Sequence, residues 1–366
     1  MLYVCNENFE RLGFIGNFSY LLWRKKYGPF AEAELHVDVT PKNIELLKKD
    51  NIIYRQDDNE VMYIYYRNFD DSNGVEQLVV KCFSLFRWTD RRLLWRQYDF
   101  DTTPEMIMRQ MIIDTMINPI DLNRKITQVK LSPAKNFGFS VQHQMTYKEV
   151  YESIEKLCET HEIGARCIFN GRELFYDFYE GMNRTINQKI NPHIILSKNR
   201  ANLLHRTYED ANNDLKTTAL IAGAGEGSER KLANIGTSFK GLARREIFID
   251  AREVSDKKDV NDDQIDIPLE EYEQLLLTKG NEKLSEYTEF IGFEAELDVT
   301  KENTKYNEDF FLGDLITIKD DELGILMNSR VMQADEVFQQ DGKSIYVSVG
   351  KSVPTLPQAI KRMVTK

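Results

Sequence analysis

The sequence contains few cysteines, and this scarcity limits both the fold and the chemistry. Four cysteines, at positions 5, 82, 158 and 167, are spread over 366 residues, which is too few and too scattered for the disulfide framework of a small secreted protein. Cys158, His161 and Cys167 suggest a metal site, but a structural zinc ion needs four ligands, usually in two close pairs. We therefore expect buried or incidental thiols in a reducing compartment, with no metal and no cofactor.

Long apolar runs and an excess of basic residues are also absent. No stretch approaches the roughly 18 consecutive apolar residues of a membrane-spanning helix, and the first residues lack the basic and apolar regions of a secretory signal. We expect no membrane segment, and synthesis in a cytoplasm. The net charge of -11 disfavours nucleic-acid binding as a function, because neutralising phosphates takes a basic surface.

Recognisable catalytic motifs are missing as well. The five histidines show no HExxH pattern, and no serine stands in a GxSxG nucleophile elbow. The glycine-rich stretch 223–227 lacks the Lys-Ser or Lys-Thr of a phosphate-binding loop, so we expect a mobile hairpin loop there. The acidic stretch 256–263 lacks the glycine and the ligand pattern of a calcium-binding loop. We expect a solvated polar loop over 256–266. No catalytic residue is predicted, although a Ser-His-Asp set of distant residues stays open.

The clearest structural signal is alternation of β-branched or aromatic residues with polar ones in 306–350. Three short segments alternate in this way, at 314–318, 325–337 and 344–349. Asp341-Gly342 favours a tight hairpin turn between the last two, because glycine adopts positive φ without steric cost. The pattern predicts an antiparallel meander, launched by a turn at Leu312-Gly313-Asp314.

Composition along the chain divides it into parts and predicts an α+β fold. Residues 1–100 are rich in strand-like segments and predict a small β-barrel or sandwich. Residues 101–190 read as helix, helix and hairpin, the first helix beginning at Thr103-Pro104-Glu105. Residues 191–352 return to strands around one helix at 268–287, and 353–366 form a short basic tail. No repeat is visible in residue identity, but this order leaves room for two structurally similar barrels.

Residues 87–96 combine arginines with tryptophans. Stacking on a single-stranded nucleic acid is one interpretation. The acidity of the chain favours another, in which the tryptophans are buried or lie at an interface and the arginines pair with acids of this chain or a neighbour. The interface candidates in this segment are Arg87, Trp88, Arg91, Arg92 and Trp95. A further candidate, for an ion pair between subunits, is Arg330 in the meander.

Several short stretches, taken together, resemble a known family, the baseplate or tail-tip hub proteins of phages and prophages of Gram-positive hosts, also described as the N-terminal region of tail-associated lysins. The stretches are IGNFSYLLWRKKY at 15–27, SLFRWTDRR at 84–92, YEGMNRT at 179–185, NLL at 202–204 with Tyr208, GLARREIFID at 241–250, LGD at 312–314 and SRV at 329–331. Each is short, but their order covers nearly the whole chain.

The resemblance implies a homotrimeric virion structural protein at the tail tip. Each subunit would contribute two tube-protein-like antiparallel β-barrels, with the α/β domain inserted between them, so that three copies form a ring of six similar barrels beneath a six-fold tail tube. The expected partners are the distal tail protein and other tail-tip or tape-measure proteins. Many members carry a C-terminal extension that cuts peptidoglycan or binds the host, whereas this sequence ends about 16 residues beyond the meander, as either a hub alone or a fragment.

Two other functions stay open. A tail-associated peptidoglycan hydrolase or endopeptidase would have its site in the α/β unit at 101–190. A module that binds carbohydrate of the host wall would use exposed aromatic side chains such as Tyr63 and Tyr65, although their alternation is better explained by sheet packing.

Overall fold

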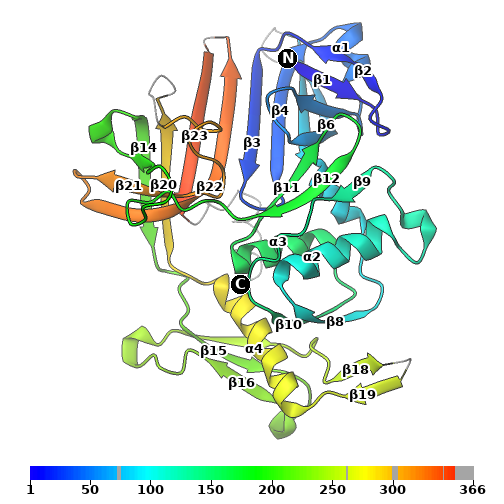
Figure 1. Ribbon diagram of the computed structural model, residues 1–366, viewed down its shortest axis with the longest axis vertical. Helices are drawn as coiled ribbons and strands as arrows, with labels where there is room; N and C mark the ends of the chain where they lie inside the picture. Colours follow the sequence, from blue (N-terminus) through cyan, green and yellow to red (C-terminus); the bar gives the residue numbers. More distant parts are fainter. Residues whose placement is uncertain (72–75, 261–262, 299–303, 341, 351–366) are drawn as a thin grey trace.

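A large, mainly antiparallel sheet of thirteen strands dominates the computed structural model (Figure 1). The structure describes residues 1–71, 76–260, 263–298, 304–340 and 342–350, so the predicted basic tail lies outside the described residues. The α/β unit lies below this sheet in the view of Figure 1, and a second, smaller sheet with α4 lies below that. Within the described ranges, no helix is long and apolar enough to cross a membrane.

A β unit occupies residues 2–84, within the range 1–100 that was predicted for it. Its elements are β1 (Leu2–Cys5), β2 (Arg11–Ile15), β3 (Tyr20–Lys26), β4 (Ala31–Asp38), α1 (Pro41–Leu46), β5 (Ile52–Arg55), β6 (Val61–Asp70) and β7 (Gln77–Ser84). Side chains alternate between buried and partly buried along β4 and β7, as expected when one face of a sheet covers a core. Trp23, Leu35 and Val80 lie in that core.

The middle of the chain forms an α/β unit with its own core. Its elements are η1 (Leu85–Arg91), β8 (Gln97–Thr102), α2 (Pro104–Ile112), η2 (Ile113–Ile117), η3 (Leu122–Arg124), β9 (Val129–Leu131), β10 (Val141–Thr146), α3 (Val150–His161), β11 (Gly164–Phe169) and β12 (Leu174–Tyr179). The predicted helix start is confirmed, because the Thr103 side chain accepts a hydrogen bond from the backbone N–H of Met106. The strands β8, β9 and β10 were not predicted.

The second β unit contains the predicted meander. Its strands are β13 (Ile195–Leu196), β14 (Leu203–Ala211), β20 (Phe290–Leu297), β21 (Leu315–Asp320), β22 (Ile325–Gln339) and β23 (Gly342–Gly350), with a short turn of helix η4 (Lys198–Arg200). Antiparallel pairing of β21 with β22 and of β22 with β23 confirms the meander. Gly342 has a φ of 139°, a value that favours glycine at the turn.

Between β14 and β20 the chain leaves the large sheet and builds a separate small core around Ile221, Tyr272 and Leu276. The elements are β15 (Thr218–Ala222), η5 (Gly227–Glu229), β16 (Leu232–Ile235), η6 (Gly241–Ala243), β17 (Glu246–Asp250), β18 (Lys257–Val260), β19 (Asp263–Asp266) and α4 (Leu269–Ser285). The helix predicted at 268–287 and the hairpin around 223–227 are confirmed. The polar loop predicted at 256–266 is wrong, because β18 and β19 pair as an antiparallel hairpin.

The two β units join into one sheet where β22 pairs with β3, from Gln333 opposite Lys26 to Gln339 opposite Tyr20. We call this pairing the seam. Arg24 and Asp335 are direct partners across it, with 2.7 Å between Nη2 and Oδ2. The prediction therefore holds at the level of two β units in a mostly β fold, and the sheet they share was not foreseen.

The two β units repeat the same strand pattern. The strand order β3-β4-β7-β6 in the first corresponds to β14-β20-β23-β22 in the second, and β5 and β21 each pair with the first part of the long strands β6 and β22. Matching positions face matching cores, as the buried pairs Ala33 and Phe293, Ile64 and Val331, and Val80 and Val347 show. The chain thus contains a structural repeat that residue identity does not reveal.

Candidate assembly site

Four of the stretches that resemble tail hub proteins meet at one place, where the large sheet contacts the α/β unit. Tyr27, in the turn after β3, is buried there. Its hydroxyl donates to the backbone carbonyls of Glu162 at 2.8 Å and Tyr179 at 3.2 Å. Burial raises the pKa of the Tyr27 hydroxyl to about 12, so it remains a proton donor. This residue connects the first β unit to the α/β unit.

Glycines allow the backbones to approach closely at this junction. A Cβ on Gly313 would lie 2.4 Å from the Tyr27 ring, and the φ of Gly313 is 91°. A Cβ on Gly181 would lie 1.9 Å from the carbonyl oxygen of Gly313. Since real Cβ atoms do not approach other heavy atoms so closely, both positions require glycine.

A buried ion pair fixes the same junction. Asp314 accepts hydrogen bonds from Arg184 Nε at 2.7 Å and from the backbone N–H groups of Met182 at 2.7 Å and Phe311 at 3.0 Å. Both charged side chains are buried. These three hydrogen bonds, one of them from a guanidinium, satisfy both oxygens of the buried carboxylate. Asp314 thereby ties the chain after β12 to the start of β21.

Arg330, predicted to form an ion pair between subunits, lies at this junction and pairs within its own chain. Its guanidinium donates to Glu162 Oε2 at 3.0 Å and to the carbonyl of Gly313 at 2.8 Å, and it lies over the Tyr27 ring. These contacts give Arg330 a structural role inside the subunit. A contact with a neighbouring copy stays a prediction.

A polar cavity of about 260 Å³ lies beside the seam. Lys25 pairs with Asp58 at 2.5 Å, and the Ser84 hydroxyl donates to Glu60. Burial raises the pKa of the Glu60 carboxyl from 4.5 to about 7. Burial also raises the pKa of the nearby Cys167 thiol, which keeps it protonated and a poor nucleophile.

Four of the five histidines have a polar partner within the chain. His36, His143 and His205 face the carboxylates of Glu34, Glu282 and Glu296, and His193 contacts a backbone carbonyl. His143 is buried, since α4 covers β10. Among the described residues, no cluster of three or more potential ligands suits a metal ion.

The arginine- and tryptophan-rich segment is divided between core and surface. Trp88 is buried and stacks on Phe9. Arg87 pairs with Asp90 and lies over the rings of Phe83 and Tyr151. These two candidates therefore support the fold of the subunit.

The remaining candidates of that segment lie nearer to solvent. Arg92 donates to the backbone carbonyls of Thr115 and Arg124. Arg91 pairs with Asp50 at 3.1 Å and its side chain is half exposed. Trp95 is 58% exposed and carries the guanidinium of Arg124 on its ring. The structure thus leaves Arg91 and Trp95 available for contacts with a neighbour.

The aromatic residues considered for carbohydrate binding lie in stacks within the chain. Tyr65 stacks on Phe83 with 4.0 Å between ring centroids, and the Arg91 guanidinium lies over Tyr63. The α/β unit, considered as the site of a hydrolase, has its helices α2 and α3 packed into a core of residues such as Met108, Ile154 and Leu157.

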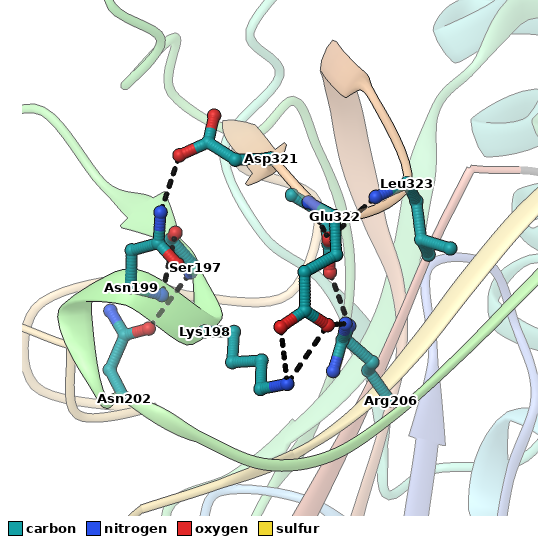
Figure 2. A network of polar contacts seen from close by, with 9 residues as sticks. Ser197, Lys198, Asn199, Asn202, Arg206, Asp321, Glu322 and Leu323 are labelled. Atoms are coloured by element: carbon teal, nitrogen blue, oxygen red, sulfur yellow. Dashed lines mark hydrogen bonds and ion pairs between the residues drawn. The ribbon is translucent and has the colours of Figure 1, made fainter.

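One network that the sequence did not predict anchors the outer strand β14 (Figure 2). Arg206 of β14 forms ion pairs with Asp320 and with Glu322, the latter at 2.7 Å. Lys198 pairs with the same Glu322 at 2.7 Å, and the Asn199 amide donates to Asp321. These partners are distant in sequence, and no local pattern connects them. Through them the turn between β21 and β22 holds β14 in place.

Comparisons with known proteins agree with this geometry. Three tail proteins of known structure, each similar over nearly the full length of both chains, share the fold. They are a tail protein of Neisseria meningitidis MC58 (TM-score 0.56, 10% identity, 95% of each chain), the 43 kDa tail protein of prophage MuSo2 from Shewanella oneidensis (0.56, 9%, 95% of this chain and 98% of that one) and prophage tail protein gp18 of Listeria monocytogenes EGD-e (0.54, 11%, 100% and 98%). A search of curated proteins found no match.

The predicted resemblance to phage tail proteins is confirmed by these folds and by a family model. The model, described as Siphovirus ReqiPepy6 Gp37-like protein, matches residues 1–351. That match spans both β units, the α/β unit and the inserted small sheet. The chain belongs to the Siphovirus ReqiPepy6 Gp37-like family of phage tail proteins.

Proposed function

We propose that this chain is a non-enzymatic hub at the distal end of a phage tail or phage-like particle, where three copies form a ring that joins the tail tube to distal components. The observation that carries the proposal is the structural repeat. Two β units of the same strand order lie side by side in one sheet, so three copies supply six similar units around one axis. A ring of this kind fits a six-fold tube on one side and a three-fold assembly on the other.

The junction supports a structural role. Tyr27 and Asp314 make buried or partly buried contacts there, and Arg330 adds an ion pair to Glu162 nearer to solvent. These contacts connect both β units to the α/β unit, so the three parts resist relative movement. In the proposed ring each unit is one of six similar tube-protein-like barrels, and the distal tail protein and tape-measure protein contact the two rims of the ring. Arg91 and Trp95 are the surface residues we assign to contacts between copies.

Light scattering coupled to size-exclusion chromatography tests the proposal on the purified chain. Over a concentration series, the mass is expected to rise toward three chains, because closing a ring buries surface on both sides of every copy. Dimers or tetramers as the end point would contradict the ring. A zymogram on host cell walls provides the test of activity, and a clear lytic band from the pure chain would contradict the non-enzymatic role.

A further inference from the structure

The strand β22, which forms one side of the seam, has a counterpart in β6 at an open edge of the same sheet. In β22, residues Ile325 to Arg330 pair with β21, a bulge follows between Val331 and Gln333, and the remaining residues pair with β3. The matching strand β6 has the same plan. Val61 to Tyr63 pair with β5, and a bulge follows between Ile64 and Tyr66. Beyond that bulge, one edge of β6 pairs with β7, and among the described residues no strand pairs with its other edge.

The other end of the sheet is open in the same way. The strand β14, which matches β3, pairs with β20 and with no second strand of the described residues. In the seam, β3 lies between β22 and β4 and Trp23 is 0% exposed. In β14 the matching residue, Tyr208, is 36% exposed. An open strand edge with exposed aromatic side chains is a feature that monomeric proteins avoid.

The register of the seam can be transferred to these open edges. The strand pairs that both units share determine which residues match. In the first unit, Tyr66 follows the bulge and faces Lys81, which faces Glu34. In the second unit, Gln333 follows the bulge and faces Ser348, which faces Glu294. Those two glutamates face Leu22 and Thr207. The seam pairs are Ala334 with Lys25, Asp335 with Arg24 and Glu336 with Trp23. The matching pairs on the open edges are Arg67 with Asp210, Asn68 with Glu209 and Phe69 with Tyr208.

The residues brought together in this way are complementary. Arg67 faces an acid, and Phe69, which is 51% exposed, faces another aromatic residue. Opposite charges and aromatic pairs are favourable across antiparallel strands. The register follows from the seam alone and does not depend on the charge pair or the aromatic pair.

Strand direction gives an independent check. The eight strands from β14 to β6 are antiparallel to their neighbours throughout. Because eight is an even number, β6 of one copy and β14 of the next run in opposite directions in a cyclic ring. A contact between these two edges in such a ring is therefore antiparallel, like the seam.

We propose that β6 of one copy pairs with β14 of a second copy, with Arg67, Asn68 and Phe69 opposite Asp210, Glu209 and Tyr208. The pairing rests on the proposed ring for its closure, and it specifies the surface through which that ring forms. The ion pairs of Arg206 with Asp320 and Glu322 fix the position of β14 within its own chain, so that its free edge can pair with β6 of the second copy (Figure 2). In Figure 1, β14 and β6 lie on opposite sides of the sheet, as a head-to-tail contact requires.

Disulfide trapping tests the register. The variant Asn68→Cys/Glu209→Cys places two thiols directly opposite each other across the proposed contact, within the distance that a disulfide can bridge. The four native cysteines are buried and leave the new pair as the reactive one. After mild oxidation, a non-reducing gel is expected to show covalent dimers and trimers. The matched control is Asn68→Cys/His205→Cys, whose second thiol lies four residues along the same exposed strand and is expected to give at most about a tenth of the product.

A charge exchange provides the second measurement. Arg67→Glu and Asp210→Arg are each expected to weaken association by about 10-fold, and the double variant is expected to regain most of it. Circular dichroism of each variant checks the fold of the subunit, because Arg67 also donates to the carbonyl of Ile44 at 2.9 Å.

Three results would be decisive. Crosslinking by the designed pair and rescue by the exchange support the edge contact. A trimer by light scattering with no more crosslinking by the designed pair than by the control would overturn the edge contact and leave the proposed hub standing. A chain that neither associates nor crosslinks at any concentration would overturn both.

Discussion

Replacing Asp314 by alanine removes the carboxylate that pairs with Arg184 in the junction. The guanidinium stays buried without a counterion, a situation that costs about 3–5 kcal/mol in proteins. The backbone N–H groups of Met182 and Phe311 also lose their acceptor. We therefore expect Asp314→Ala to lower the free energy of unfolding by about 3–5 kcal/mol, measured by urea unfolding with tryptophan fluorescence and circular dichroism.

The matched control is Asp321→Ala, an acid of the same unit whose side chain is about half exposed. Its loss is expected to cost less than about 1 kcal/mol, because exposed ion pairs contribute little. The double variant Arg184→Met/Asp314→Ala removes the unpaired charge as well and is expected to be more stable than Asp314→Ala alone. Equal effects of Asp314→Ala and the control, or a double variant that recovers no stability, would show that the buried Arg184 does not need Asp314 as its counterion.

Three further predictions follow from the geometry. Gly181→Ala is expected to destabilise the chain by several kcal/mol, because its Cβ would overlap the carbonyl oxygen of Gly313. In the control Gly16→Ala, the new Cβ meets only a side chain at 3.7 Å, so the melting temperature should change little. Similar melting temperatures for the two variants would contradict this prediction. The pKa of the Glu60 carboxyl is 4.5 in the unfolded chain and about 7 in the folded chain, so the folded state loses stability as pH rises between those values. The free energy of unfolding of Glu60→Gln should therefore exceed that of the native chain by about 3 kcal/mol at pH 8 and by little at pH 4. A difference that does not change with pH in urea titrations would be inconsistent with the raised pKa. Trp95→Ala should leave the urea midpoint nearly unchanged, because the side chain is mostly exposed, but weaken ring formation in light scattering, and unchanged association would remove Trp95 from the contacts between copies.

The sequence predicted those elements whose signal is local. Alternation in 306–350 gave the meander within a few residues of β21, β22 and β23, and the Thr103-Pro104 pair marked the start of α2. The strand β9 has only three residues, which is too few to show a period. The hairpin of β18 and β19 was read as a loop because its residues are mostly charged.

The candidate site was harder to predict because it depends on contacts distant in the sequence. Motifs containing Gly181, Gly313 and Arg330 were recognised, but nothing in their composition shows that they meet around Tyr27. The structural repeat is equally hidden. Ala33 and Phe293 occupy matching buried positions, and a core requires a buried apolar side chain at such a position rather than one particular residue.

Electron cryomicroscopy of an assembled tail shows directly how many copies of the chain it contains and where they lie. We expect three copies around the tail axis, forming a ring of six similar β units in which β6 of each copy continues into β14 of the next. A copy number other than three, or a position away from the end of the tail tube, would contradict the hub.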